Sequence, residues 1–212
     1  MTELTKTEPQ LPTPADDPYA VYARSVASDI PFLKFVKGEF QSGVDADTLL
    51  LGTRLVPHMA ELKAGLIKWH DGVPIGDAMV KVVDGKPIPE REDLGDDDRN
   101  EWELDPNGIA IDPWQACNTL PMKGVETGEE YVFTTGSRGG IGAVEKLAMA
   151  YGRQRYKHNG QLPVIEIGSD SYRHKTYGDV PYPTLKIVAW QSEEDLIAGE
   201  TDEDELNDSV PF

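Results

Sequence analysis

The sequence has a single cysteine, no long apolar run and no apolar leader. A lone thiol, Cys117, cannot form an intramolecular disulfide, which argues against a disulfide-framed secreted domain. No stretch approaches the roughly 18 apolar residues of a membrane helix. Residues 1–14 lack the positively charged start and apolar stretch of a secretory signal. These absences predict a cytoplasmic protein that has no membrane partner.

Catalytic and metal-binding motifs are also missing. The four histidines, His58, His70, His158 and His174, are far apart, and none pairs with Cys117 or another histidine at zinc-ligand spacing. The Gly-x-Ser-x-Gly elbow of serine hydrolases and the Lys-Ser/Thr ending of a P-loop are absent. We therefore predict no enzyme, no catalytic residue, no metal and no cofactor.

One segment shows part of a calcium-loop spacing. Glu103, Asp105, Asn107 and Gly108 stand at loop positions 1, 3, 5 and 6. Trp114 stands at position 12, where a calcium loop requires a bidentate glutamate. The four residues that begin at Asp105 are instead typical of a type I turn, which is what we predict here.

Charge is the strongest compositional signal, and it is unevenly distributed. The 212 residues carry 38 acidic and 20 basic side chains, a net charge of −18. Residues 1–133 hold 25 acidic and 12 basic side chains, and residues 191–212 hold nine acidic and no basic ones. Residues 134–190 hold eight basic and four acidic side chains. Because acidic surfaces repel nucleic acid, only this basic region is a candidate surface for binding it.

The chain divides into three predicted parts. A proline-rich leader occupies residues 1–28, with a short helix possible over 19–28, and an acidic tail occupies residues 191–212. Between them lies a folded domain, 29–190, with a helix predicted at 140–157 and an acidic surface insertion at 84–108. Alternating apolar and polar residues predict strands at 32–40, 49–57, 62–70, 78–83, 131–135, 164–167 and 185–190.

This order of strands, one main helix and two closing strands predicts a mostly β, α+β fold. A five-stranded oligonucleotide-binding barrel has its helix between the third and fourth strands, which fits the same order. The chain offers more than five candidate strands, so such a barrel would require insertions. An open sheet fits the pattern nearly as well, and both alternatives stay open.

The end of the tail has a distinct chemistry. An acidic run leads into an apolar tip, whose aromatic ring suits an apolar pocket with a basic rim. Asp208, Val210, Pro211 and Phe212 resemble the C-terminal tip of bacterial single-stranded DNA-binding proteins and of several phage counterparts. Ser209 stands where the bacterial tip usually carries another aspartate. The resemblance covers about the last 13 residues and does not extend to the body of the chain.

The resemblance implies two activities. In that family the tip recruits replication, recombination and repair enzymes, and it can fold back onto the DNA-binding groove of its own protein. By resemblance, this chain binds single-stranded DNA and recruits such enzymes through its tip. A homo-oligomer stays open, because nothing in the sequence decides the oligomeric state.

Sequence-neutral binding of single strands requires a basic groove and aromatic side chains on which bases stack. The basic region contains both residue types in close succession. Some members also suit other roles, because Tyr151 falls on the apolar face of the predicted helix and cations near its C-terminal end complement the helix dipole. The predicted DNA-binding residues are Arg138, Tyr151, Arg153, Arg155, Tyr156, Lys157, Tyr172, Arg173, Lys175 and Tyr177, together with Trp69.

The glycine-rich segment 136–142 precedes the predicted helix, where it is either a flexible connection or a loop that holds a phosphate with Arg138. Our main hypothesis is a non-enzymatic single-stranded DNA-binding protein from a phage or another mobile element. Two alternatives stay open. One is an acidic adaptor or DNA-mimicking decoy that binds tip-recognising enzymes without binding DNA, and the other is an enzyme that acts on nucleic acid at 136–142.

Overall fold

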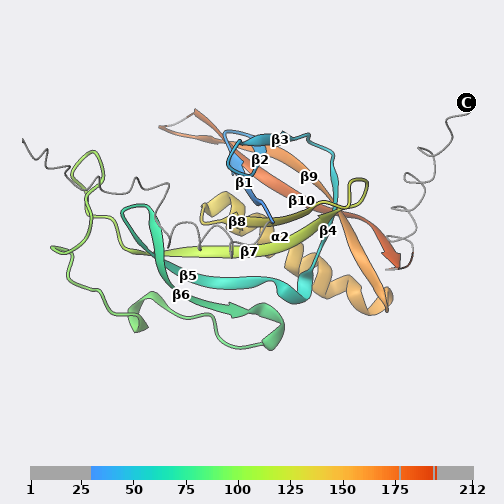
Figure 1. Cartoon of the computed structure of the whole chain (residues 1–212), viewed down its shortest axis with the longest axis horizontal. Coiled ribbons are helices and arrows are strands. Elements are labelled where there is room, and N and C mark those ends of the chain that lie inside the picture. The colour runs from blue at the N-terminus through green and yellow to red at the C-terminus, as the bar shows by residue number, and fades with distance from the viewer. Residues whose placement is uncertain (1–29, 177, 193, 195–212) are drawn as a thin grey trace, which may run out of the picture. The chain divides into compact units, whose positions relative to one another are not determined.

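The computed structural model describes residues 30–176, 178–192 and 194 (Figure 1). The predicted leader, Tyr177 and most of the predicted tail lie outside the described residues, including the tip residues Asp208, Val210, Pro211 and Phe212. Within the described part the chain is mostly β with one α-helix, which confirms the predicted α+β class. None of the helices in that part is long and apolar enough to cross a membrane.

Ten strands form one mixed sheet. They are β1 (Phe32–Val36), β2 (Glu39–Ser42), β3 (Asp47–Leu49), β4 (Arg54–Pro57), β5 (Lys63–His70), β6 (Val73–Lys81), β7 (Trp114–Gly124), β8 (Glu130–Thr135), β9 (Gln161–His174) and β10 (Gly178–Ser192). The main path runs β10-β9-β4-β7-β8-β1-β2-β3, and β5 joins β6 to β7. The β1–β8 pair is parallel, and the other pairs of named strands are antiparallel.

The single strand predicted at 32–40 is wrong, because the structure has the β1–β2 hairpin there. Val36 pairs with Glu39, and Lys37 and Gly38 form a two-residue turn with φ of 51° and 98°. Positive φ at both turn positions is typical of the tight turns that match strand twist. Apolar and polar residues keep alternating through the turn, so the sequence pattern alone does not reveal where the turn lies. The strand predicted at 49–57 is likewise divided, between β3 and β4.

The central strand β7 was not predicted at all, and it pairs with β4, β5 and β8. Proline inside a run usually argues against a central strand, because its missing N–H cannot join a ladder. In β7, however, β5 pairs up to Thr119 and β4 pairs from Met122. Pro121 therefore lies where one neighbouring strand replaces the other, and the missing N–H breaks neither ladder.

The two closing strands were predicted in the right order but are much longer than expected. β9 and β10 form one hairpin with a register shift between Ile187 and Ala189. Pro181 and Pro183 lowered the strand signal in β10. They are tolerated because β10 is the terminal strand of the main path, and an edge strand needs N–H groups on one side only.

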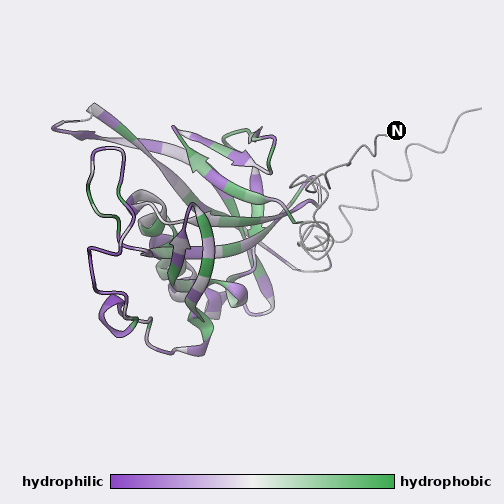
Figure 2. Cartoon of the chain, turned by 60° about the vertical axis from the view of Figure 1, so that its left-hand side comes forward, coloured by the Kyte–Doolittle hydropathy of each residue, from purple (hydrophilic) through white to green (hydrophobic). Residues whose placement is uncertain are grey.

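The core lies between the sheet and helix α2 (Arg138–Gln154). Ala143, Val144 and Leu147 of the helix are buried against a cluster that includes Phe40 and Phe133 of the sheet. Figure 2 shows the apolar and polar residues alternating as green and purple bands along the strands. The predicted helix is confirmed, with a start two residues earlier and an end three residues earlier than expected, since residues 155–157 form a 3-10 turn.

The glycines of segment 136–142 serve packing at the start of α2. The helix begins at Arg138, so most of these glycines are helical and the segment is not a free loop. A Cβ on Gly140 would lie 1.9 Å from Thr135 Oγ1, and a Cβ on Gly139 would lie 2.7 Å from Tyr182 Cβ. These approaches bring the helix close to β8 and β10.

Replacing the helix cap should destabilise the protein moderately. Ser137 is the N-cap residue of α2, and its side-chain oxygen accepts a hydrogen bond of 3.0 Å from the Gly140 N–H. Ser137→Ala should lower the free energy of unfolding by about 0.5–2 kcal/mol, measured by urea denaturation. Ser137→Asp, which retains an acceptor, should stay near the parent. Equal midpoints for the parent and the alanine variant would contradict the capping role.

Candidate nucleic-acid interface

The structure divides the predicted DNA-binding residues among separate places. Arg138 and Tyr172 line one groove between α2 and the β9–β10 hairpin. Tyr151, Arg153, Arg155, Tyr156 and Lys157 lie along the C-terminal end of α2 and the following turn, while Trp69 lies in β5. The predicted set is therefore not one surface.

The groove at Arg138 has a volume of about 470 Å³. It combines cations from the helix with aromatic rings from the hairpin, which are the two residue types that single-strand binding requires. Besides two glycines, the lining includes three residues that were absent from the predicted set: Lys146, His174 and Tyr182. We refer below to this space as the α2–hairpin groove.

Helical and strand periodicities together build this groove. Arg138, Gly142 and Lys146 are four residues apart, which places them on one face of α2. On the hairpin, Tyr182 pairs with Asp170. Because alternate residues share a face of a strand, Tyr172 projects from the same side as Asp170 and Tyr182. A Cβ on Gly142 would meet no atom within 4 Å, so the helix side of the groove is open there.

Two further predicted residues do not line the groove, Arg173 because of this alternation and Lys175 because it lies in the turn after β9. Arg173 lies between Tyr172 and His174, which line the groove, and Lys175 follows them. Arg173 is therefore directed to the opposite face of the sheet from Tyr172, and both cations are exposed. Neither lines the groove.

Tyr182 is held by contacts with charged groups, and its ring contacts that of Tyr172. The Tyr182 hydroxyl donates a 3.0 Å hydrogen bond to Asp170 Oδ2, and Lys146 Nζ lies 5.6 Å from the centre of the Tyr182 ring. The Tyr172 and Tyr182 ring centres are 6.2 Å apart at an interplanar angle of 40°. The pKa of the Asp170 carboxyl is lowered, first by the Ser171 N–H and then by Tyr182, so this carboxylate is an acceptor at neutral pH.

A second cavity continues the groove along the helix. It has a volume of about 550 Å³ and shares Lys146 and Tyr182 with the first. Gln154 marks its far end on α2, and Lys186 of β10 adds a further cation. From Arg138 to Gln154 the helix rises about 24 Å at 1.5 Å per residue. The two cavities together therefore form an elongated track beside the helix.

The C-terminal end of α2 carries a separate aromatic stack. His158 and Trp190 stack with ring centres 4.4 Å apart, and Tyr151 stacks on Trp190 at 5.9 Å. The Arg155 guanidinium lies 4.7 Å from the Tyr156 ring centre and donates a 2.7 Å hydrogen bond to its hydroxyl. The rings of His158, Trp190 and Tyr151 contact one another and pack this end of the helix, while Tyr156 is exposed.

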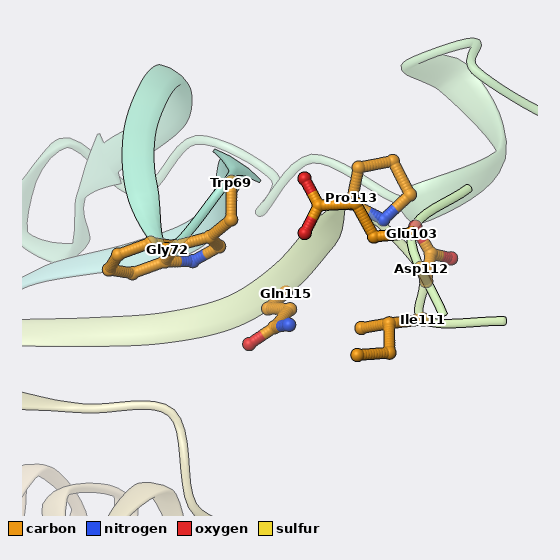
Figure 3. Close-up of a pocket in the computed structure, with 7 residues that line it drawn as sticks. All are labelled: Trp69, Gly72, Glu103, Ile111, Asp112, Pro113 and Gln115. Atoms are coloured by element: carbon orange, nitrogen blue, oxygen red, sulfur yellow. The ribbon is translucent and has the colours of Figure 1, made fainter. Parts of the chain in front are cut away.

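Trp69 belongs to a different and acidic environment. With Glu103, Asp112 and Gln115 it lines a cavity of about 350 Å³ formed in part by residues 84–113, which we call the acidic segment (Figure 3). The predicted turn that begins at Asp105 is confirmed nearby, where Gly108 N–H donates to the Asp105 carbonyl at 2.9 Å. The carboxylates at this cavity would repel a phosphate backbone, so Trp69 is not grouped with the basic groove.

Among the described residues, one exposed group has three potential metal ligands close together: His70, Asp71 and Glu103. The two ring nitrogens of His70 face different carboxylates. Nδ1 lies 2.9 Å from Glu103 and Nε2 lies 3.7 Å from Asp71. These side chains are exposed and already contact one another, so we interpret the group as a surface hydrogen-bond cluster.

Sequence signals existed for the missed groove residues. Lys146 is eight residues after Arg138, two helical repeats along the same face. Tyr182 is one of the tyrosines of the basic region, and its pairing with Asp170 across the hairpin fixes the face on which it lies. Comparison of the chain with protein-family models, with curated proteins and with solved structures finds no match.

Proposed function

We propose that this chain binds single-stranded DNA in the α2–hairpin groove without catalysing a reaction. The observation that carries the proposal is the convergence of Arg138 and Lys146 with Tyr172 and Tyr182 on one groove. The guanidinium and ammonium groups contact phosphates, and the exposed Tyr172 ring offers a face to a base. Every base has such a face, so the binding tolerates any sequence.

The tail has its own role in the proposal. By the resemblance of Asp208, Val210, Pro211 and Phe212 to the bacterial tip, it recruits enzymes of replication, recombination or repair. A barrel of the oligonucleotide-binding type stays a prediction. Eight strands precede α2, where that barrel has three, and the main strand path of the described sheet is not closed, which favours the open-sheet alternative.

The test is the salt dependence of binding. A labelled oligothymidine, titrated with the full chain at several salt concentrations, should bind more tightly than a duplex of the same length. Each phosphate contact on a single strand contributes about 0.7 to the slope of log affinity against log salt. The double variant Arg138→Ala/Lys146→Ala should therefore lower the magnitude of that slope by about 1.4.

A matched control removes two cations elsewhere. Lys63 of β5 and Lys86 of the acidic segment are exposed and lie outside the α2–hairpin groove. The double variant Lys63→Ala/Lys86→Ala should leave the slope close to that of the parent. Equal losses in both double variants, or no binding by the parent, would refute the groove as the DNA site.

A further inference from the structure

The acidic segment 84–113 forms a second cavity-bearing surface, unrelated to the groove. It holds 11 acidic and three basic residues. The segment lies against the turn end of the β5–β6 hairpin, where the Asp71 N–H donates to Glu103, and both line the cavity at Trp69 (Figure 3). The α2–hairpin groove shares none of its lining residues with this cavity.

Internal contacts give the segment a defined fold. Arg91 Nε lies 2.9 and 2.7 Å from the two carboxylate oxygens of Asp112, and its Nη1 donates to the Gly95 carbonyl at 2.7 Å. Asp96 accepts from Lys68 Nζ at 2.9 Å and from Trp114 Nε1 at 2.8 Å. The pKa of the Asp96 carboxyl is lowered, mainly by Lys68 and then by Trp114. Arg91 and Lys68 therefore pair with carboxylates inside the protein, and within the described part of the chain most of the acidic side chains of the segment have no cation beside them.

The cavity combines apolar walls with hydrogen-bond acceptors. Trp69, Ile111 and Pro113 supply the walls. The Glu103 carboxylate projects toward the Trp69 ring (Figure 3). Its Oε1 takes both nearby contacts, from the Asp71 N–H at 2.7 Å and from His70 Nδ1 at 2.9 Å. Oε2 has no partner among the described residues, so one acceptor oxygen is available at the cavity.

We propose that this cavity binds a lysine or arginine side chain from a basic segment of a partner protein. The aliphatic stem of such a residue lies along the apolar walls, while its cationic head contacts the Trp69 ring face and Glu103 Oε2. The negative field of the surrounding segment attracts basic peptides and repels nucleic acid. This proposal is independent of the proposed DNA binding, because it uses other residues and a ligand of opposite charge.

The test uses the full chain without DNA. The probe is a fluorescein-labelled peptide with two arginines among glycine and serine, and its matched control carries citrulline at both arginine positions. The arginine peptide should bind saturably, and the citrulline peptide should bind at least about tenfold more weakly, because it lacks the charge. Glu103→Gln should weaken binding of the arginine peptide about 10-fold, and Trp69→Leu about threefold to 30-fold.

Glu92→Gln is the matched control variant, because Glu92 is exposed in the same segment and lies outside the cavity lining. It should change the affinity less than about twofold, as expected for one screened surface charge. Equal losses of affinity in Glu92→Gln and Glu103→Gln would mean that the peptide is held only by the overall negative charge, and this would overturn the proposal. Equal binding of the citrulline peptide and the arginine peptide would also overturn it. If the chain alone formed a dimer and Glu103→Gln abolished that dimer, the cavity would bind a second copy of the chain, which would overturn the proposal as well. Glu103→Gln preserves side-chain shape, so it keeps the test valid if Trp69→Leu fails to fold.

Discussion

Tyr172→Ala is expected to weaken binding of a labelled oligothymidine by about 5- to 150-fold, the loss that corresponds to 1–3 kcal/mol of base stacking. The Tyr172 side chain is 48% exposed and lies on the groove side of the hairpin, so a base can reach its ring without rearrangement of the protein. Fluorescence anisotropy at fixed salt measures the loss. The charge of the groove is unchanged, so the salt slope should stay that of the parent.

Two companion variants separate stacking from other effects. Tyr172→Phe keeps the aromatic face and should bind within about twofold of the parent, because stacking needs the ring and not the hydroxyl. Tyr156→Ala removes a tyrosine that is 78% exposed but lies beyond the end of α2, outside the groove. It should have little effect. A larger loss for Tyr156→Ala than for Tyr172→Ala would move the binding site to the C-terminal end of the helix.

Phe133→Ala is expected to destabilise the fold by about 3–5 kcal/mol, the usual cost of deleting a buried phenyl ring. Phe133 is fully buried at the centre of β8, where β8 pairs with both β7 and β1, and its ring centre is 5.8 Å from that of Phe40. Domains have only about 5–15 kcal/mol of net stability, so this single change removes a large share of it. Urea denaturation followed by far-ultraviolet circular dichroism measures the change.

Phe32→Ala is the control for this prediction, since it deletes the same ring from the neighbouring strand β1. The Phe32 side chain is 59% exposed, so its removal leaves no cavity and should change stability by about 0.5 kcal/mol or less. Similar midpoints for the two variants would mean that the β1–β8 side of the sheet is not the main core.

Local sequence patterns predicted the elements whose signal is local. The helix was identified because Val144, Leu147, Ala148 and Tyr151 recur at helical spacing, and β8 was identified from a short run of β-branched and aromatic residues. β7 was missed because its pairing is non-local. Pro121 is tolerated because it lies between the part of β7 that pairs with β5 and the part that pairs with β4. A short sequence window around Pro121 contains neither of these strands.

The candidate site was predicted in part for the same reason. Arg138 and Tyr172 were selected by residue type within a basic region, and both lie in the groove. Trp69 was chosen for its ring and its place at the end of a predicted strand, and the fold brings the carboxylates of Glu103 and Asp112 to the same cavity. Lys146 was left out of the predicted DNA-binding residues. It lies on the same face of α2 as Arg138, but only the tertiary structure shows that this face lies beside the β9–β10 hairpin.

Composition and periodicity by themselves determined the mostly β class, the basic character of residues 134–190 and the acidic character of the segments on either side of it. These properties follow from residue type and short-range spacing. The tertiary structure alone decided which cations meet which rings. The pairing of Asp170 with Tyr182 places Tyr172 and Tyr182 on the same face of the hairpin, and Gly139 allows α2 to approach that face closely. Both depend on contacts between distant segments, because side chains far apart in the chain become neighbours only when the strands are in register.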